Sequence, residues 1–115
     1  MKKILIVFLL SISFLVVSCD SCDNENPSVQ LVNNGTGKAD IQIKTSGGNT
    51  ENINNILPGT ASERRAFAFG SIEFTIAIQG VNENVVYTLQ TLTCKDYTVT
   101  INSDNTVSST SDNRD

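Results

Sequence analysis

The sequence predicts an all-β protein, a small antiparallel β-sandwich of seven to eight strands. Two observations support this prediction. Apolar residues recur at every second position over much of the chain after residue 28, as half-buried strands require. Clusters of Gly, Asn, Ser and Pro separate these runs, at spacings of roughly 8 to 12 residues that are typical of sandwiches and small barrels. No helical period of three turns or more occurs in this region.

The first strands are expected between residues 29 and 57. Residues 29–31 (VQL) begin the alternation, and residues 39–44 (ADIQIK) continue it with apolar side chains at every odd position. Between them, residues 33–37 (NNGTG) accept the positive φ that a tight turn requires. A weaker apolar segment follows at 53–57, and Pro58-Gly59 then supplies a strong turn signal.

The strand signal is clearer in the second half of the chain. Phe67 and Phe69 are spaced by two, and residues 72–78 alternate Ile and Phe with Glu, Thr and Ala. Residues 85–89 place Val, Tyr and Leu on one face, and residues 97–101 do the same with Tyr, Val and Ile. Each run therefore has one face to bury and one face to expose to water.

Packing these apolar faces together predicts an immunoglobulin-like or transthyretin-like sandwich over residues 28–108. The polar segment 109–115 is expected to be a disordered tail. The predicted core consists of Ile41, Ile43, Ile56, Phe67, Phe69, Phe74, Ile76, Tyr87, Leu89, Tyr97, Val99 and Ile101.

The N-terminal residues differ from the rest of the chain. Residues 1–3 (MKK) are basic, and residues 4–17 are apolar except for two serines. This order is typical of a secretory signal peptide. A membrane-spanning helix needs about 20 apolar residues, so the run is too short to span a bilayer. We assign residues 1–18 to a signal peptide and leave them out of the fold.

The end of this segment, Val16-Val17-Ser18-Cys19, resembles the lipobox of bacterial lipoproteins. An aliphatic residue lies three positions before the cysteine, and a small residue lies directly before it. The resemblance implies that the Cys19 thiol receives a diacylglycerol, that cleavage makes Cys19 the first mature residue, and that its amine is acylated, for example with palmitate. The alternative is ordinary secretory cleavage after Ser18, which leaves Cys19 as a free thiol.

The resemblance also implies a location. Residues 19–27 (CDSCDNENP) form an acidic tether, and they resemble the leaders of outer-membrane and surface lipoproteins in Bacteroidota. We therefore expect a lipid-anchored protein of the bacterial cell envelope, on the outer membrane and facing the periplasm or the cell surface. The expected partner is the membrane itself, which the protein binds through lipidated Cys19, because two or three acyl chains hold a protein persistently.

Cys19 and Cys22 also stand in a C-x-x-C spacing. A redox pair belongs at the start of a helix, whereas DNENPS follows Cys22. A zinc site would need a second pair of ligands, but the chain has no histidine and only Cys94 besides. We predict no metal site. In an exported protein Cys22 and Cys94 are candidates for a disulfide; the alternative leaves Cys22 in a flexible leader and Cys94 unpaired.

Composition argues against several classes of function. The absence of histidine excludes Ser-His-Asp and Cys-His catalysis, and the acidic residues fall on expected turns or exposed faces. We predict that the protein is not an enzyme and needs no cofactor. The formal net charge of −4, without a basic face that carries aromatic residues, argues against nucleic acid as a partner.

Arg64 and Arg65 are the one local cationic spot and a candidate site for a protein partner of the envelope or the exterior. Alternatively, they pair with Glu63 or a neighbouring strand. We therefore predict a lipid-anchored, non-enzymatic interaction or accessory module. The second hypothesis is a membrane-anchored inhibitor of a host or competitor enzyme, which presents the loop from Pro58 to Arg65.

Overall fold

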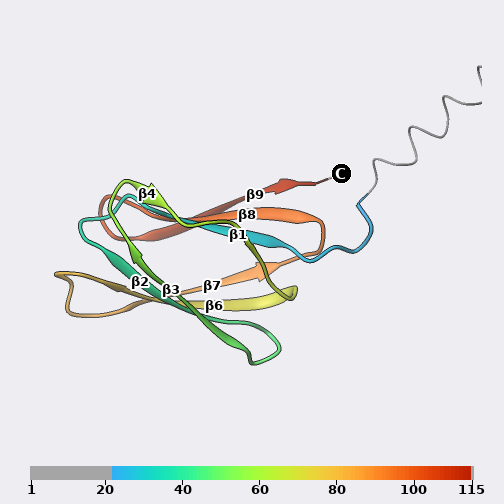
Figure 1. The fold of residues 1–115 in the computed structure, drawn as a ribbon, viewed down its shortest axis with the longest axis horizontal. Coiled ribbons are helices and arrows are strands. Elements are labelled where there is room, and N and C mark those ends of the chain that lie inside the picture. The colour runs from blue at the N-terminus through green and yellow to red at the C-terminus, as the bar shows by residue number, and fades with distance from the viewer. Residues whose placement is uncertain (1–21, 115) are drawn as a thin grey trace, which may run out of the picture.

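The computed structural model describes residues 22–114, so the predicted signal peptide and Cys19 lie outside the described residues. These residues form two facing β-sheets (Figure 1). The prediction of a small all-β sandwich is confirmed. One sheet contains β1 (Ser28–Asn33), β4 (Thr60–Ala61), β5 (Arg65–Ala66), β8 (Lys95–Ile101) and β9 (Val107–Asn113). The other contains β2 (Ala39–Lys44), β3 (Thr50–Ile56), β6 (Gly70–Ile78) and β7 (Val85–Thr91).

Among the strands of residues 22–114 one pair is parallel, which corrects the expectation of a wholly antiparallel sandwich. The first sheet has the order β4-β1-β8-β9, with β5 also paired to β1, and the second has the order β3-β2-β6-β7. β1 and β8 run parallel, with Val29 opposite Tyr97. The physical reason is that β1 is followed by a strand of the other sheet. The turn at 33–37 therefore crosses between sheets instead of closing a hairpin, and β1 takes a distant strand as its neighbour.

The core lies between the sheets and is built by the period-two alternation. Phe74 is fully buried at the centre of β6. The predicted core is confirmed except at two positions: Phe69 is 58% exposed, and Tyr87 is only partly buried. The hydroxyl of Tyr87 lies 2.7 Å from that of Ser109. The core residues that the prediction omitted are Val29, Leu31, Ala39, Ile72 and Ile78.

Residues 22–114 form nine strands rather than seven or eight, and the last of them corrects the predicted tail at 109–115. Two of the strands, β4 and β5, are only two residues long and pair with β1. Residues 107–113 form β9 along the whole of β8. This strand was missed because it carries a single apolar residue, Val107. Its backbone pairs with the N–H and C=O groups of β8. Backbone groups need such partners whatever side chains the strand carries.

A buried amide links the two sheets where β1 ends. The side-chain nitrogen of Asn33 donates to the carbonyl oxygens of Gly37 (2.9 Å) and of Ile56 in β3 (2.8 Å). Its side-chain oxygen accepts from the Gly35 N–H (2.9 Å). Asn33 is 0% exposed, so these bonds replace the water that the amide loses on burial.

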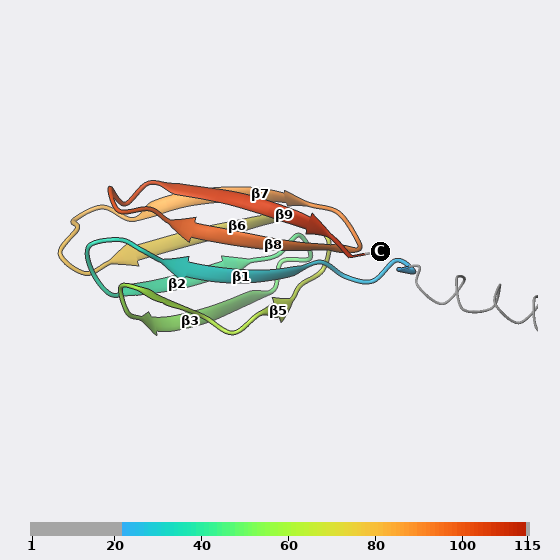
Figure 2. The ribbon, with the colours of Figure 1, turned by 90° about the horizontal axis from the view of Figure 1, so that it is seen from above.

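The sandwich has two ends that differ in their connections (Figures 1 and 2). One end, which we call the leader end, carries the β2–β3, β5–β6 and β7–β8 connections. Cys22 and Arg114 lie there too, since both are bonded to Cys94 in the β7–β8 connection. The opposite end carries the turns β1–β2, β3–β4, β6–β7 and β8–β9. Within residues 22–114 there is no helix with the length and apolarity needed to cross a bilayer.

Candidate functional site

A disulfide attaches the start of the described chain to the leader end. Cys22 is bonded to Cys94, which lies 72 residues later in the β7–β8 connection, and their Cα atoms are 5.9 Å apart. The Cys94 N–H donates to the Glu25 carbonyl oxygen (2.9 Å), and the Arg114 N–H donates to the Cys94 carbonyl oxygen (3.0 Å). Pro27 is buried. Residues 22–27 are therefore part of the folded body, which shortens the tether predicted at 19–27.

A set of polar side chains reinforces this attachment; we call Glu25, Ser28, Asp96 and Arg114 the clasp. One Asp96 oxygen accepts from the Ser28 hydroxyl (2.6 Å) and from two guanidinium nitrogens of Arg114 (2.7 and 3.1 Å). Arg114 also donates to the carboxylate of Glu25 (3.1 Å). The guanidinium thus bridges the leader and β8, with the fixed geometry that suits arginine to paired carboxylates.

The clasp sets the charge states of its members. The hydrogen bond from Ser28, followed by those from Arg114, holds the pKa of Asp96 below its usual value of 3.8. The hydrogen bond to Asp96 is the main reason that the pKa of Arg114 is raised. Both shifts favour the charged forms, so the leader is held by ion pairs at neutral pH.

Replacing Asp96 by Asn is therefore expected to make the unfolding free energy of the protein change less when the pH is lowered. Because the pKa of Asp96 is lower in the folded state, its contribution is present above the unfolded-state value and is lost as the pH falls from about 5 through 3.8 and below. Urea midpoints of the wild type and Asp96→Asn should differ at about pH 6, and the difference should shrink as the pH is lowered through 3.8. Glu83→Gln, an exposed position between β6 and β7 at the opposite end of the sandwich, is the control and should follow the wild type.

The two candidate partner-binding arginines are close in sequence but have different surroundings. Arg64 donates to the Ser28 hydroxyl (2.9 Å), to the Tyr97 carbonyl oxygen (3.0 Å) and, at 3.4 Å, to the Thr98 hydroxyl. Arg65 forms ion pairs with Glu63 (2.9 Å) and Glu51 (3.3 Å). Both side chains thus have intramolecular partners, and a ligand would have to compete with them.

The segment from Pro58 to Arg65 lies along β1 rather than projecting as a loop. The Gly59 N–H donates to the Asn33 carbonyl oxygen (2.6 Å), and the Ser62 N–H donates to that of Leu31 (2.8 Å). These bonds hold the segment at the edge of the sheet, where β4 and β5 pair with β1. An inhibitory role for this segment stays a prediction.

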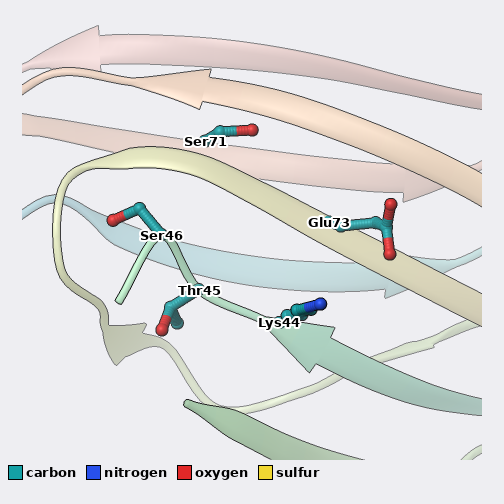
Figure 3. Close-up of a pocket in the computed structure, with 5 residues that line it drawn as sticks. All are labelled: Lys44, Thr45, Ser46, Ser71 and Glu73. Atoms are coloured by element: carbon teal, nitrogen blue, oxygen red, sulfur yellow. The ribbon is translucent and has the colours of Figure 1, made fainter. Parts of the chain in front are cut away.

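A shallow polar hollow of about 220 Å³ lies on the outer face of the second sheet, near the end of β2 (Figure 3). Lys44 and Glu73 are register partners on β2 and β6, and Ser46 and Ser71 complete the rim with Thr45. Thr45 is buried, but its hydroxyl donates to the Asn49 carbonyl oxygen (3.3 Å). The hollow thus brings together a single carboxylate and a single ammonium group, both on exposed residues. Its lining lacks the pair of carboxylates that acid–base chemistry would use.

The acidic residues of residues 22–114 do not gather into a metal-binding cluster. Asp104 lies in the β8–β9 turn and accepts from both the N–H (3.1 Å) and the hydroxyl (2.6 Å) of Thr106. The hydroxyl bond, then the backbone bond, lowers the pKa of Asp104. Its role in this part of the chain is to close a turn.

Sequence reasoning missed the clasp, because Arg114 falls in the segment that was expected to be disordered. The one signal that could have suggested it is the isolated arginine in the otherwise uncharged or acidic stretch after residue 96. An isolated cation of this kind near the C-terminus of an acidic chain is a candidate for a carboxylate pair.

Comparison with known proteins assigns no family: no protein-family model matches the chain, and no curated protein matches its sequence. The bases for a functional proposal are therefore the lipobox resemblance of residues 1–19 and the geometry of the leader end.

Proposed function

We propose that this chain is a bacterial envelope lipoprotein, anchored through Cys19 to the outer membrane, whose β-sandwich acts as a non-enzymatic interaction module. The observation that carries the proposal is the Cys22–Cys94 disulfide. Disulfides persist in exported proteins, in agreement with a signal peptide at residues 1–18. The disulfide also couples the candidate lipidation site to the folded body, because Cys22 lies three residues after Cys19.

Lipid, rather than charge, provides the attachment. The formal net charge of the chain is −4, and both lysines of the basic start belong to the predicted signal peptide. A polybasic patch would be needed for electrostatic binding to anionic lipid. Each buried CH₂ group of an acyl chain contributes about 0.8 kcal/mol, and two or more chains hold a protein durably without spanning the membrane.

The side chains that the fold presents support a role in binding rather than catalysis. The chain has no histidine, and the hollow on the second sheet contains one carboxylate. The domain is instead cross-linked at its leader end and held by buried hydrogen bonds at the other, as suits a rigid platform that holds a surface in a fixed orientation. The protein partner would be another component of the envelope or its surroundings.

The proposal is tested by expressing the full-length chain in a bacterial host and comparing it with Cys19→Ser. We expect the wild type to partition into detergent and its mature N-terminal peptide to begin at Cys19 with diacylglycerol and acyl mass. Cys19→Ser should lose this modification and remain unprocessed at the lipoprotein cleavage site. The control Cys94→Ser removes a different cysteine and should keep the lipid. An unmodified Cys19 in the mature wild type would contradict the proposal.

A further inference from the structure

Two large apolar side chains are exposed at the leader end. Phe69 is 58% exposed and directly precedes β6, and Leu92 is 62% exposed and directly follows β7. These strands are antiparallel neighbours, and their first register pair is Gly70 with Thr91. Phe69 and Leu92 thus flank the two members of this pair, at the leader end, where Cys22 is bonded to Cys94 of the β7–β8 connection. Figure 2 shows that β7 ends on the side of the sandwich where the C-terminus lies.

Hydrogen bonds fix the backbone on both sides of this pair. The buried Thr91 hydroxyl accepts from the Gly70 N–H (2.9 Å) and donates to the Gly70 carbonyl oxygen (2.8 Å). The Ser46 hydroxyl donates to the Phe69 carbonyl oxygen (2.9 Å), and the Leu92 N–H donates to the hydroxyl of buried Tyr97 (2.9 Å). The two apolar side chains therefore extend from a rigid rim, and the structure gives them no place in the core.

The length of the chain limits how far the proposed anchor, Cys19, can lie from this rim. Leu92 lies two residues before Cys94, which is cross-linked to Cys22. The three residues from Cys22 back to Cys19 span at most about 11 Å when fully extended. Polar headgroups occupy roughly 5 to 7 Å on each side of a bilayer, so a lipid on Cys19 leaves little space between the membrane and the leader end.

We propose that Phe69 and Leu92 insert into the headgroup region of the bilayer that holds the Cys19 lipid, so that the sandwich stands with its leader end on the membrane. This inference rests on the proposed function. The charge of Arg114 is already paired with Glu25 and Asp96, so the contact is made by apolar side chains to a zwitterionic surface. The exposed Leu57 belongs to the β3–β4 turn at the opposite end and faces away from the membrane.

The chain contains no tryptophan, so single substitutions introduce a unique fluorescent reporter. Full-length Phe69→Trp and Leu92→Trp, with Leu57→Trp as the matched control, are purified in detergent and reconstituted into phosphatidylcholine vesicles. Interfacial side chains reach a depth of about 5–10 Å, so brominated phosphatidylcholine is expected to quench the reporters at positions 69 and 92 roughly twofold or more strongly than the reporter at 57. Aqueous acrylamide should show the reverse order.

Flotation of the same vesicles separates the two proposals. If the protein floats with the vesicles but all three reporters respond alike, the docked orientation is overturned and the anchor stands. If the protein does not float, the anchor is overturned and the orientation with it. All three positions are more than half exposed, so the substitutions should leave the fold intact, and an unchanged circular dichroism spectrum checks this.

Discussion

A variant that lacks the disulfide, Cys22→Ser with Cys94→Asn, is expected to lose roughly 4 kcal/mol of unfolding free energy. The bond closes a loop across 72 residues, and without it the unfolded chain regains the conformational entropy of that loop. Asparagine is chosen at position 94 because Cys94 has a φ of 63°, a region that asparagine tolerates better than most residues. For a domain of this size the loss corresponds to a fall in Tm on the order of 20 °C.

Urea and thermal unfolding monitored by circular dichroism measure this effect. Reduced wild-type protein should match the variant, because both lack the same cross-link. Cys19→Ser leaves the Cys22–Cys94 bond intact and should unfold like the oxidised wild type. A loss below about 1 kcal/mol in the double variant would mean that the clasp holds the leader without help from the covalent bond.

Asn33→Asp is expected to destabilise the fold by about 3 kcal/mol or more at neutral pH. The buried amide nitrogen donates to the carbonyl oxygens of Gly37 and Ile56. A carboxylate oxygen in the same place could not donate to these two carbonyl oxygens. Its negative charge would also be buried away from water. The exposed neighbour Asn34 supplies the control Asn34→Asp, which should change stability by less than about 0.5 kcal/mol.

The pH dependence of this variant has a definite sign. Burial raises the folded-state pKa of the introduced carboxyl above its unfolded value, so between these two pKa values the folded state binds more protons. The defect is full above the folded-state pKa, diminishes as the pH falls from there towards about 4, and changes no further below that. Urea midpoints at pH 7 and pH 4 measure it. A variant as stable as the wild type at pH 7 would show that the Asn33 amide does not link the two sheets.

The sequence predicted the strands well wherever one face is buried. In β2, β6 and β8 the alternation is strict, and the residues that it assigns to the core, such as Ile43, Phe74 and Val99, are buried. Phe69 shows the limit of the pattern. It shares its parity with the buried Phe67, but no strand joins them, and the chain turns at Gly70, whose φ is 118°. A two-residue spacing fixes a common face only within a strand.

The clasp lay beyond sequence reasoning for a related reason. Ser28 and Asp96 are unremarkable in the sequence, and Arg114, although an isolated cation, lies in a different part of the chain from both. The parallel register that sets Ser28 opposite Asp96 depends on two strands that are far apart in sequence. The antiparallel register of β9 then carries the chain back to Arg114.

By itself, the sequence determined the all-β class, most of the core and the lipobox-like motif that points to Cys19, because alternation and a short motif are local features of the chain. Only the tertiary structure decided that Cys22 meets Cys94, that β9 completes a sheet, and that Phe69 and Leu92 share the leader end. Those outcomes depend on which distant segments become neighbours, and that choice is made by packing and backbone hydrogen bonding across the whole domain.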